Sequence, residues 1–360
     1  MNRCVARLRP PLSRLLIAAA VLTPLVAPSP SGAADKYRSE VAAPSVFAEI
    51  ADPGHPFGLL ATEDAVYVAT SKGSPFRPGG EEVVLRYPTA GGSPTARATV
   101  MTMPTMGLHD MAADGNGRVY VVDMNSRILR FTPTRNGLGT PEVYAAVPEP
   151  YASAGWAASM WQNLAFDTDG SLYVSDASLG AIWRIPPNGK PAMWFQSPAL
   201  LSSQLSGVNG LAISPDHQLY LVLAGSPAPD TFANTVVYRL PLGPTPAQDQ
   251  LRLVHAFPIA PGSQPTPFPI GADLAFARSG NLYVTLAGSD QVAGLRPDGT
   301  ELPRITSPLL DVPIGMKFQG TSLLVASSNY FPPENSGHWK VVRVPVGEEG
   351  LPLLRPQLPR

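Results

Sequence analysis

Acid, amide and histidine side chains occur repeatedly in this 360-residue sequence, each time directly ahead of a short apolar stretch. The set comprises His55, His109, Asp110, Gln162, Asn163, Asn209 and Asp273. Carboxylate and amide oxygens are the ligands that Ca²⁺ prefers, so Asp110, Asn163, Asn209 and Asp273 could hold one such cation. They could equally cap strand ends or bond water in a wet channel, and the sequence leaves both interpretations open.

Other motifs for catalysis are missing from the sequence. No Gly-x-Ser-x-Gly, His-Glu-x-x-His or phosphate-binding glycine loop occurs, which removes the main support for a serine hydrolase, zinc protease or nucleotide-dependent enzyme. The run from Asp167 to Gly170 begins like a calcium loop but lacks its distal glutamate and flanking helices, so it predicts a hairpin turn. His217 and His255 are interpreted as structural, whereas His338 falls in a long predicted loop.

The candidate residues belong to a repeated pattern of an apolar strand, a tight polar turn and a strand centred on Leu-Tyr-Val. Its six copies are marked by the strand-centre residues Tyr67, Tyr120, Tyr173, Tyr220, Tyr283 and, in a degenerate copy, Leu324. Intervals of 41 to 63 residues between markers predict stacked supersecondary units.

Each repeat continues with two more predicted strands. The second copy, for example, is followed by Ile128-Leu-Arg130-Phe and then by Glu142 to Ala146. Four strands separated by Asp-Gly or Asn-Gly turns form an antiparallel meander, and six such sheets arranged radially give an all-β, six-bladed β-propeller. A parallel β-helix would need a much shorter repeat, and the strand and helix alternation of an α/β fold is missing.

Ring closure and loop placement follow from the order of the strands. Either Ser45 to Ile50 or Leu351 to Leu354 could supply the last outer strand, and the sequence does not choose. Strand direction alternates, so the short turns share one end of the propeller and the long segments share the other. The long segments are 71–82, 148–161, 224–235, 258–271 and 327–338. Binding chemistry is expected at the end with the long loops.

Residues 1–34 predict a Sec-type secretory signal peptide, which leaves residues 35–360 as a single propeller domain. Arg3 to Arg14 contribute four basic residues ahead of the apolar run Leu15 to Val26, and small residues follow through Ala34. The only cysteine, Cys4, lies in this leader without a lipidation motif. We therefore expect a secreted or extracytoplasmic protein without a membrane span.

The composition of the mature chain limits the classes of partner that we expect it to bind. Removing the leader leaves 22 basic and 27 acidic residues, a formal charge of −5, without a basic patch for nucleic acid. A chain with 44% apolar residues can bury a large core, which must provide its stability without any disulfide. We expect a monomer.

The repeats resemble those of the senescence marker protein, gluconolactonase and luciferin-regenerating-enzyme-like family of six-bladed propellers, with NHL-type propellers as near relatives. The resemblance rests on Asn163-Leu-Ala-Phe-Asp-Thr-Asp-Gly-Ser-Leu-Tyr-Val-Ser-Asp176 and Val208-Asn-Gly-Leu-Ala-Ile-Ser-Pro-Asp216, and it spans most of the mature chain. It implies hydrolysis of lactones or related esters with one divalent cation, which a glutamate, asparagines and an aspartate hold at the channel mouth.

The implied ligands transfer unevenly to this sequence. Asn209 matches the family asparagine, whereas Asp273 and Asn163 each come one residue after the matching positions, and His55-Pro-Phe-Gly58 replaces the glutamate. One step along a strand reverses a side chain's direction, so the late residues need a bulge to reach the axis.

Two functions remain open from the sequence. In the first, Ca²⁺ or a similar cation on Asn209, Asp273, Asn163 and Asp110 polarises a lactone or ester carbonyl and activates water, with His109 or His55 as general base. In the second, the propeller is a non-catalytic recognition module whose long loops bind a sugar, a peptide or a surface polymer.

Overall fold

The computed structural model describes residues 42–51, 54–71, 81–101, 107–123, 125–134, 137–154, 158–187, 189–201, 207–224, 234–258, 271–329 and 339–359. The predicted leader and most of the predicted long loops, with His338, lie outside these residues. The signal peptide and the domain boundary at residue 35 therefore stay predictions. Within the described ranges, no helix is long and apolar enough to cross a bilayer.

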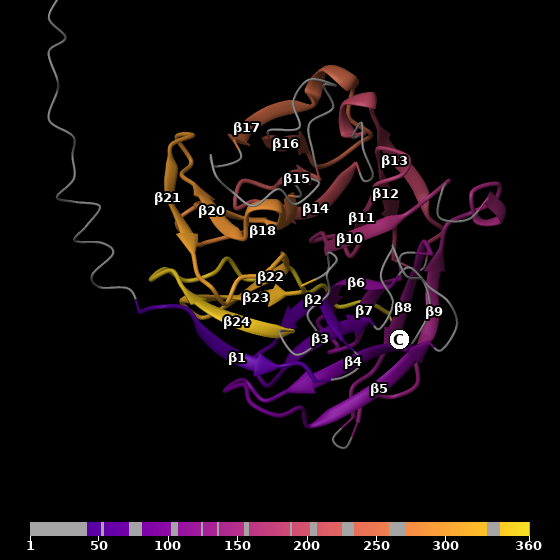
Figure 1. Cartoon of the computed structure of the whole chain (residues 1–360). Coiled ribbons are helices and arrows are strands. Elements are labelled where there is room, and N and C mark those ends of the chain that lie inside the picture. Colours follow the sequence, from indigo (N-terminus) through magenta and orange to yellow (C-terminus); the bar gives the residue numbers. More distant parts are fainter. Residues whose placement is uncertain are drawn as a thin grey trace, which may run out of the picture. The chain divides into compact units, whose positions relative to one another are not determined.

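Six antiparallel sheets of four strands each surround one axis, as Figure 1 shows. Blades one and two are β2 (His55–Ala61), β3 (Val66–Ser71), β4 (Glu82–Tyr87), β5 (Ala96–Met101), and β6 (Leu108–Ala113), β7 (Val119–Asp123), β8 (Arg127–Phe131), β9 (Glu142–Ala146). Blades three and four are β10 (Trp161–Phe166), β11 (Leu172–Asp176), β12 (Ala181–Ile185), β13 (Ala192–Gln196), and β14 (Val208–Ile213), β15 (Gln218–Leu223), β16 (Asn234–Pro241), β17 (Arg252–Pro258). Blades five and six are β18 (Gly271–Phe276), β19 (Leu282–Leu286), β20 (Gln291–Leu295), β21 (Glu301–Thr306), and β22 (Pro313–Gln319), β23 (Ser322–Ser327), β24 (Lys340–Pro345), β1 (Ser45–Glu49). The predicted six-bladed propeller is confirmed.

Short 3-10 helices lie between some of the strands. They are η1 (Ala152–Ala154), η2 (Pro198–Leu200), η3 (Gln248–Gln250) and η4 (Ala287–Ser289).

The N-terminal end of the propeller closes the ring. Strand β1 pairs antiparallel with β24, so the outermost strand of blade six comes from the front of the chain. The inner strands contact one another in a complete circle, in which β22 also contacts β2. This settles the alternative that the sequence left open in favour of residues 45–50.

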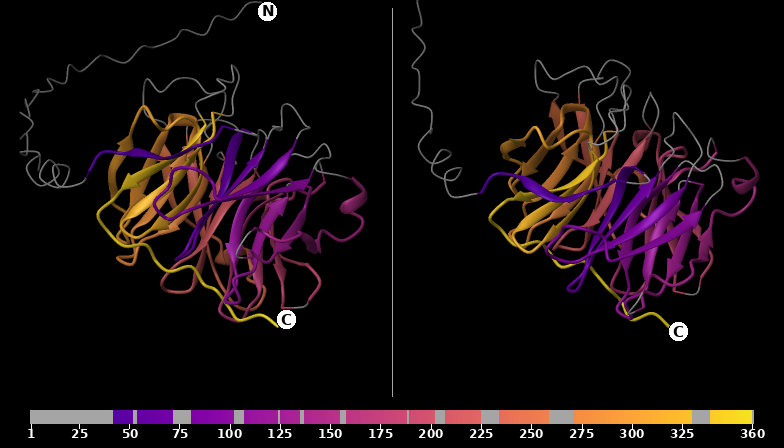
Figure 2. Two further views of the ribbon diagram at one scale, coloured as in Figure 1. Left: turned by 90° about the horizontal axis from the view of Figure 1, so that it is seen from below. Right: turned by 60° about the horizontal axis from the view of Figure 1, so that its bottom comes forward.

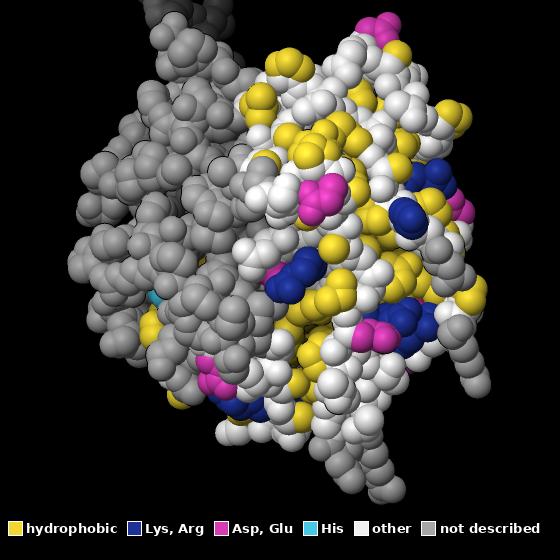
Figure 3. Space-filling model, turned by 90° about the vertical axis from the view of Figure 1, so that its right-hand side faces the viewer, with side chains coloured by type: hydrophobic (Ala, Val, Ile, Leu, Met, Phe, Trp, Pro, Cys, Tyr) yellow, Lys and Arg dark blue, Asp and Glu magenta, His cyan; other side chains and the backbone are white. Residues whose placement is uncertain are grey.

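The hydrophobic core lies between neighbouring sheets. One cluster joins Tyr120 of blade two to Trp161, Phe166 and Trp183 of blade three, and similar clusters occupy the other interfaces between blades. On the outer side shown in Figure 3, hydrophobic, basic and acidic side chains are interspersed. Burial between blades thus stabilises the ring without any disulfide.

The second candidate for ring closure, residues 351–354, belongs to a C-terminal segment that crosses the end with the short turns (Figure 2). Its first contact is with blade five, where Leu351 N donates to Phe276 O at 2.8 Å. Arg355 then donates to Ala61 O of blade one at 2.8 Å. The segment therefore ties several blades together from below.

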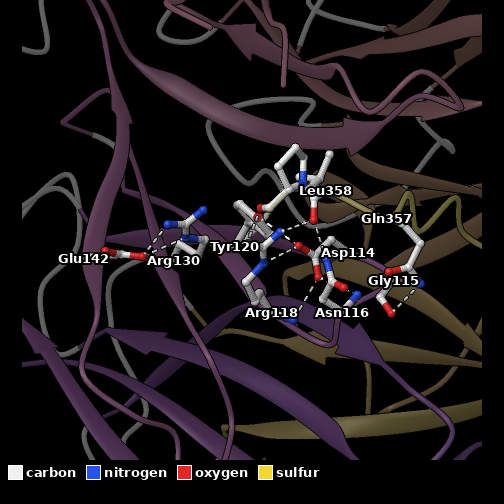
Figure 4. A network of polar contacts seen from close by, with 10 residues as sticks. Asp114, Gly115, Asn116, Arg118, Tyr120, Arg130, Glu142, Gln357 and Leu358 are labelled. Atoms are coloured by element: carbon white, nitrogen blue, oxygen red, sulfur yellow. Dashed lines mark hydrogen bonds and ion pairs between the residues drawn. The ribbon is translucent and has the colours of Figure 1, made fainter. Parts of the chain in front are cut away.

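A polar network around Arg118 fixes the far end of this segment (Figure 4). Arg118 donates to Asp114 at 2.6 Å and to the carbonyl oxygens of Leu358 and Pro359 at 3.2 and 2.9 Å. Tyr120 donates to the same carboxylate at 3.0 Å. The turn at Asp114 is thus used as an anchor for the C-terminus.

Glycines allow the inner strands to approach closely at three points. A Cβ at Gly58 would overlap the carbonyl oxygen of His109, and a Cβ at Gly315 would overlap that of Phe57. A Cβ at Gly210 would lie 2.7 Å from the carbonyl oxygen of Ala272, which is also closer than a normal contact. A larger side chain would push neighbouring blades apart at the axis.

We predict that Gly58→Ala lowers the free energy of unfolding by about 2–4 kcal/mol, because backbone must move to admit the methyl group. Gly137→Ala is the matched control, since its Cβ would meet an ordinary contact with Thr134, and it should change stability by less than about 0.5 kcal/mol. Chemical denaturation followed by fluorescence measures both. Equal effects of the two substitutions would contradict the close approach of the strands.

Candidate functional site

Every inner strand carries a β-bulge at the same position, where two of its residues face one residue of the second strand. In order around the ring, the bulge pairs are Phe57 and Gly58, His109 and Asp110, Gln162 and Asn163, Asn209 and Gly210, Ala272 and Asp273, Ile314 and Gly315. A bulge interrupts the strict alternation of side chains. The late residues Asn163 and Asp273 thereby have the bulge that the sequence required for reaching the axis, and Asp110 lies at the equivalent position of blade two.

Hydroxyl side chains complete the hydrogen bonding of two bulges. Ser175 accepts from Asn163 N at 3.0 Å and donates to Asn209 O of the next blade at 2.5 Å. Thr285 accepts from Asp273 N at 2.9 Å and donates to Ile314 O at 2.8 Å. Each hydroxyl therefore satisfies backbone groups that the irregular pairing leaves open, and holds adjacent inner strands together.

Two predicted site residues from opposite blades meet on the channel axis, with a lysine between them. The Lys317 ammonium lies 2.9 Å from Asp110 Oδ1 and 2.8 Å from Asp273 Oδ2. Strands β6 and β18, which carry the two carboxylates, stand three blades apart in a ring of six. A group that contacts both must therefore lie close to the axis, and all three side chains are buried.

The two carboxylates differ in how completely they are bonded. Asp273 accepts hydrogen bonds from Lys317 Nζ, Met316 N and Leu274 N, each at 2.8 Å. Asp110, in contrast, pairs with Lys317 Nζ through Oδ1 at 2.9 Å, and its Oδ2 has no well-directed hydrogen-bond partner among the described residues. Burial without such partners disfavours an ionised carboxylate.

The charge state of Asp110 reflects this setting. Burial raises its pKa to about 6; the Lys317 ammonium counteracts this, and the Asp273 carboxylate adds to it. For Lys317 itself, burial disfavours the charged form, but the two carboxylates outweigh burial and raise its pKa. Lys317 therefore stays charged over the pH range around 6 in which Asp110 gains or loses its proton.

A second group of predicted residues lies on the neighbouring bulges. Asn163 Nδ2 donates to Asn209 Oδ1 at 3.3 Å and lies 3.5 Å from His109 Nδ1. Burial lowers the pKa of His109 to about 4, a backbone hydrogen bond with Gln162 opposes this, and Lys317 adds to the lowering. At neutral pH the imidazole of His109 is therefore uncharged.

The two predicted general bases, His55 and His109, have different surroundings in the structure. His55 contacts Ser328 O through Nδ1 at 2.9 Å, so this nitrogen carries the proton. Its ring packs against Trp339 at 5.1 Å between ring centres, whereas Phe57 packs against both imidazoles. His109 lies beside the predicted amide ligands; His55 lies at the entry of blade one.

Lys317 was not identified from the sequence, although the aligned repeats contain a signal for it. The residue paired with each repeat marker is Leu60, Ala112, Ala165, Ala212, Ala275 and, in blade six, Lys317. Four small alanines and one basic residue at equivalent positions indicate that a long side chain fills the space that the alanines leave. The degenerate copy of the repeat thus supplies the charge.

An axial cavity of about 750 Å³ lies on the short-turn side of Lys317. Its wall includes the four alanines and the Lys317 side chain, and the C-terminal residues 349–355 bound it from below. The cavity wall next to the ammonium is thus lined by small alanines, while polar residues such as His217, Arg278 and Glu349 also line the cavity.

The remaining predictions concern residues away from the axis. Asp167 to Gly170 forms the predicted turn, with Gly170 N donating to Asp167 O at 3.1 Å. His217 contacts Asp167 at 2.6 Å and His255 contacts Glu301 at 2.7 Å, and each contact joins neighbouring blades. Their interpretation as structural residues is consistent with these contacts.

The predicted divalent cation does not fit its predicted ligands while Lys317 is in place. The ammonium takes the space between Asp110 and Asp273, and two backbone N–H groups also occupy the oxygens of Asp273. Among the described residues, no group of three His, Cys, Asp or Glu side chains could hold a metal ion. The Lys317 ammonium takes the place of a metal ion between the two carboxylates.

The fold and this channel define a six-bladed propeller with a polar axial site. No family model and no curated protein matches the sequence. Among solved structures, a luciferin-regenerating enzyme is similar with a TM-score of 0.59, 16% identity and coverage of 88% of this chain and 100% of that one.

Two further solved structures share the fold. A putative gluconolactonase has a TM-score of 0.57, 16% identity and coverage of 87% of this chain and 95% of its own. A calcium-binding protein, regucalcin from Agrobacterium tumefaciens, has a TM-score of 0.57, 15% identity and coverage of 88% and 99%. The fold resemblance predicted from the sequence is confirmed, whereas the roles of individual residues rest on their own geometry.

We predict that acid lowers the stability of this protein in part because the buried His109 must then accept a proton. Its pKa is about 4 when folded and 6.5 when unfolded, so its contribution to stability is complete above pH 6.5 and is lost as the pH falls through 4. The free energy of unfolding in urea should therefore fall by about 2–3 kcal/mol more in the natural protein than in His109→Gln when the pH is lowered from 7 to 4. An equal fall in both proteins would mean that His109 is not buried in its neutral form. Asp110 titrates in both proteins, so its opposite effect cancels in the difference.

Proposed function

We propose that this protein hydrolyses a small lactone or ester in its axial channel, with Asp110 as the general base. The observation that carries the proposal is the Asp110 carboxylate, which is 2% exposed at the axis and pairs with Lys317 through Oδ1, while Oδ2 has no well-directed hydrogen-bond partner among the described residues. A structural carboxylate at such depth normally has its oxygens satisfied. An oxygen left open in a channel is available to accept a proton from water.

The electrostatics around Asp110 suit that role. A general base works best when its pKa lies near the working pH, and burial together with Lys317 and Asp273 brings Asp110 to about 6. The ammonium at 2.9 Å keeps the ionised form accessible in spite of burial. Lys317 thus serves as a fixed positive charge in the site.

The neighbouring bulges supply groups for the substrate. Neutral His109 and the amides of Asn163 and Asn209 form one connected set of donors and acceptors. Donors of this kind stabilise the negative charge that develops on a carbonyl oxygen under attack. We assign the carbonyl of the substrate to this set.

The reaction follows in two steps. Asp110 takes a proton from water as its oxygen adds to the carbonyl carbon, and His109 and Asn163 stabilise the oxyanion. The bond between that carbon and the ring or ester oxygen then breaks, and the proton on Asp110 passes to the leaving oxygen. One water is consumed for each hydroxy acid, or acid and alcohol, that forms.

The likeness to a putative gluconolactonase and a luciferin-regenerating enzyme supports this proposal as an analogy of fold. The signal peptide predicted from the sequence supports a location outside the cytoplasm as part of this proposal. The recognition module remains the alternative, and it predicts binding of a sugar, peptide or polymer without turnover.

We predict that Asp110→Asn lowers kcat/KM for lactone hydrolysis by about 10²–10⁴-fold, because the amide cannot accept the proton. A panel of lactones and esters with chelator present provides the assay. Asp298→Asn, at a fully exposed turn, is the matched control and should keep full activity. A purified protein that binds a panel member but turns over none of the compounds would favour the recognition module.

We also predict an acidic limb near pH 6 in the profile of kcat/KM, with activity above that pH, where Asp110 is ionised. Lys317→Met removes the charge that lowers the pKa of Asp110, so the limb should move to higher pH. A limb that stays in place would show that another group is the base. The shift distinguishes an acting carboxylate from a structural one.

A further inference from the structure

The ammonium of Lys317 lies on the axis of the ring, between carboxylates from two opposite blades. We propose that this lysine is the resident cation of the channel, that it keeps divalent cations out, and that its removal opens a latent Ca²⁺ site among Asp110, Asp273, Asn163 and Asn209. The proposal concerns cation binding and does not depend on the hydrolase reaction.

The spacing of the carboxylates supports a cation-sized position. Both oxygens lie within 3 Å of one nitrogen, so they are less than about 6 Å apart. Calcium binds oxygen at about 2.3–2.6 Å, so each carboxylate would have to move inward by only a few tenths of an ångström. The amides of Asn163 and Asn209 stand on the next two bulges and supply neutral oxygen ligands.

Exclusion of divalent cations in the natural protein follows from the bonding of Lys317. The ammonium is covalently tethered, buried and paired with two carboxylates, which keep it charged at neutral pH. A divalent cation would have to displace it from both carboxylates into the cavity, where four alanines surround the Lys317 position. This loss of pairing opposes entry of a free ion.

The repeats indicate that the backbone tolerates alanine at this position. Four other blades carry alanine where blade six has Lys317, with the same pairing to the second strand. Lys317→Ala therefore removes the ammonium without a steric conflict. It leaves two buried carboxylates that repel each other, which a bound Ca²⁺ would neutralise.

Thermal unfolding with and without millimolar Ca²⁺, together with titration calorimetry with Ca²⁺ alone, tests the proposal. Without Ca²⁺, Lys317→Ala should lower Tm by roughly 5–10 °C because it leaves buried charges unpaired. Calcium should restore most of that loss and bind at one site, whereas the natural protein should show neither a shift nor binding. Lys190→Ala, at an exposed position, is the matched control and should behave as the natural protein.

The double variant Asp110→Asn with Lys317→Ala should lose the calcium effect, since one of its two charged ligands is gone. Binding of one Ca²⁺ by the natural protein would overturn the exclusion, and a Lys317→Ala protein without any response to Ca²⁺ would overturn the latent site. A variant that folds neither with nor without Ca²⁺ would count against the site equally, because the bound cation is expected to restore the fold. None of these measurements uses a substrate, so failure of the hydrolase proposal gives a separate result.

Discussion

Closure of the ring through β1 and β24 is the constraint on which the rest of this structure depends. Once the first and last blades are joined, the six inner strands form a complete circle and their bulged positions face one axis. Residues of β6 and β18, far apart in the sequence, then contact a single ammonium. An open array of the same sheets would leave each of these polar groups on a separate surface.

The bulges and glycines together set the width of the channel. Each bulge places two residues of an inner strand opposite one residue of the second strand, and three of the six pairs end in glycine, which lets the backbone of the neighbouring blade come close. The other three pairs end in Asp110, Asn163 or Asp273. Backbone therefore fills the space beside the three glycines, whereas polar side chains fill the equivalent space in the other three blades.

The electrostatics of the site follow from one buried positive charge. Lys317 moderates the pKa of Asp110, pairs with Asp273 and helps to keep His109 neutral. A calcium-binding protein shares the fold, but here a side chain occupies the place between two of the predicted metal ligands.

The sequence by itself determined the all-β architecture, the number of blades and the residues that open the inner strands, because period-2 strands and Asp-Gly turns act locally. It could not choose the strand that closes the ring, since β1 and residues 351–354 carry similar apolar patterns. It also did not reveal that Lys317 joins Asp110 to Asp273, or that Asp110 Oδ2 has no well-directed hydrogen-bond partner among the described residues. Those facts depend on distances across the axis between residues far apart in the chain, and only the folded ring fixes such distances.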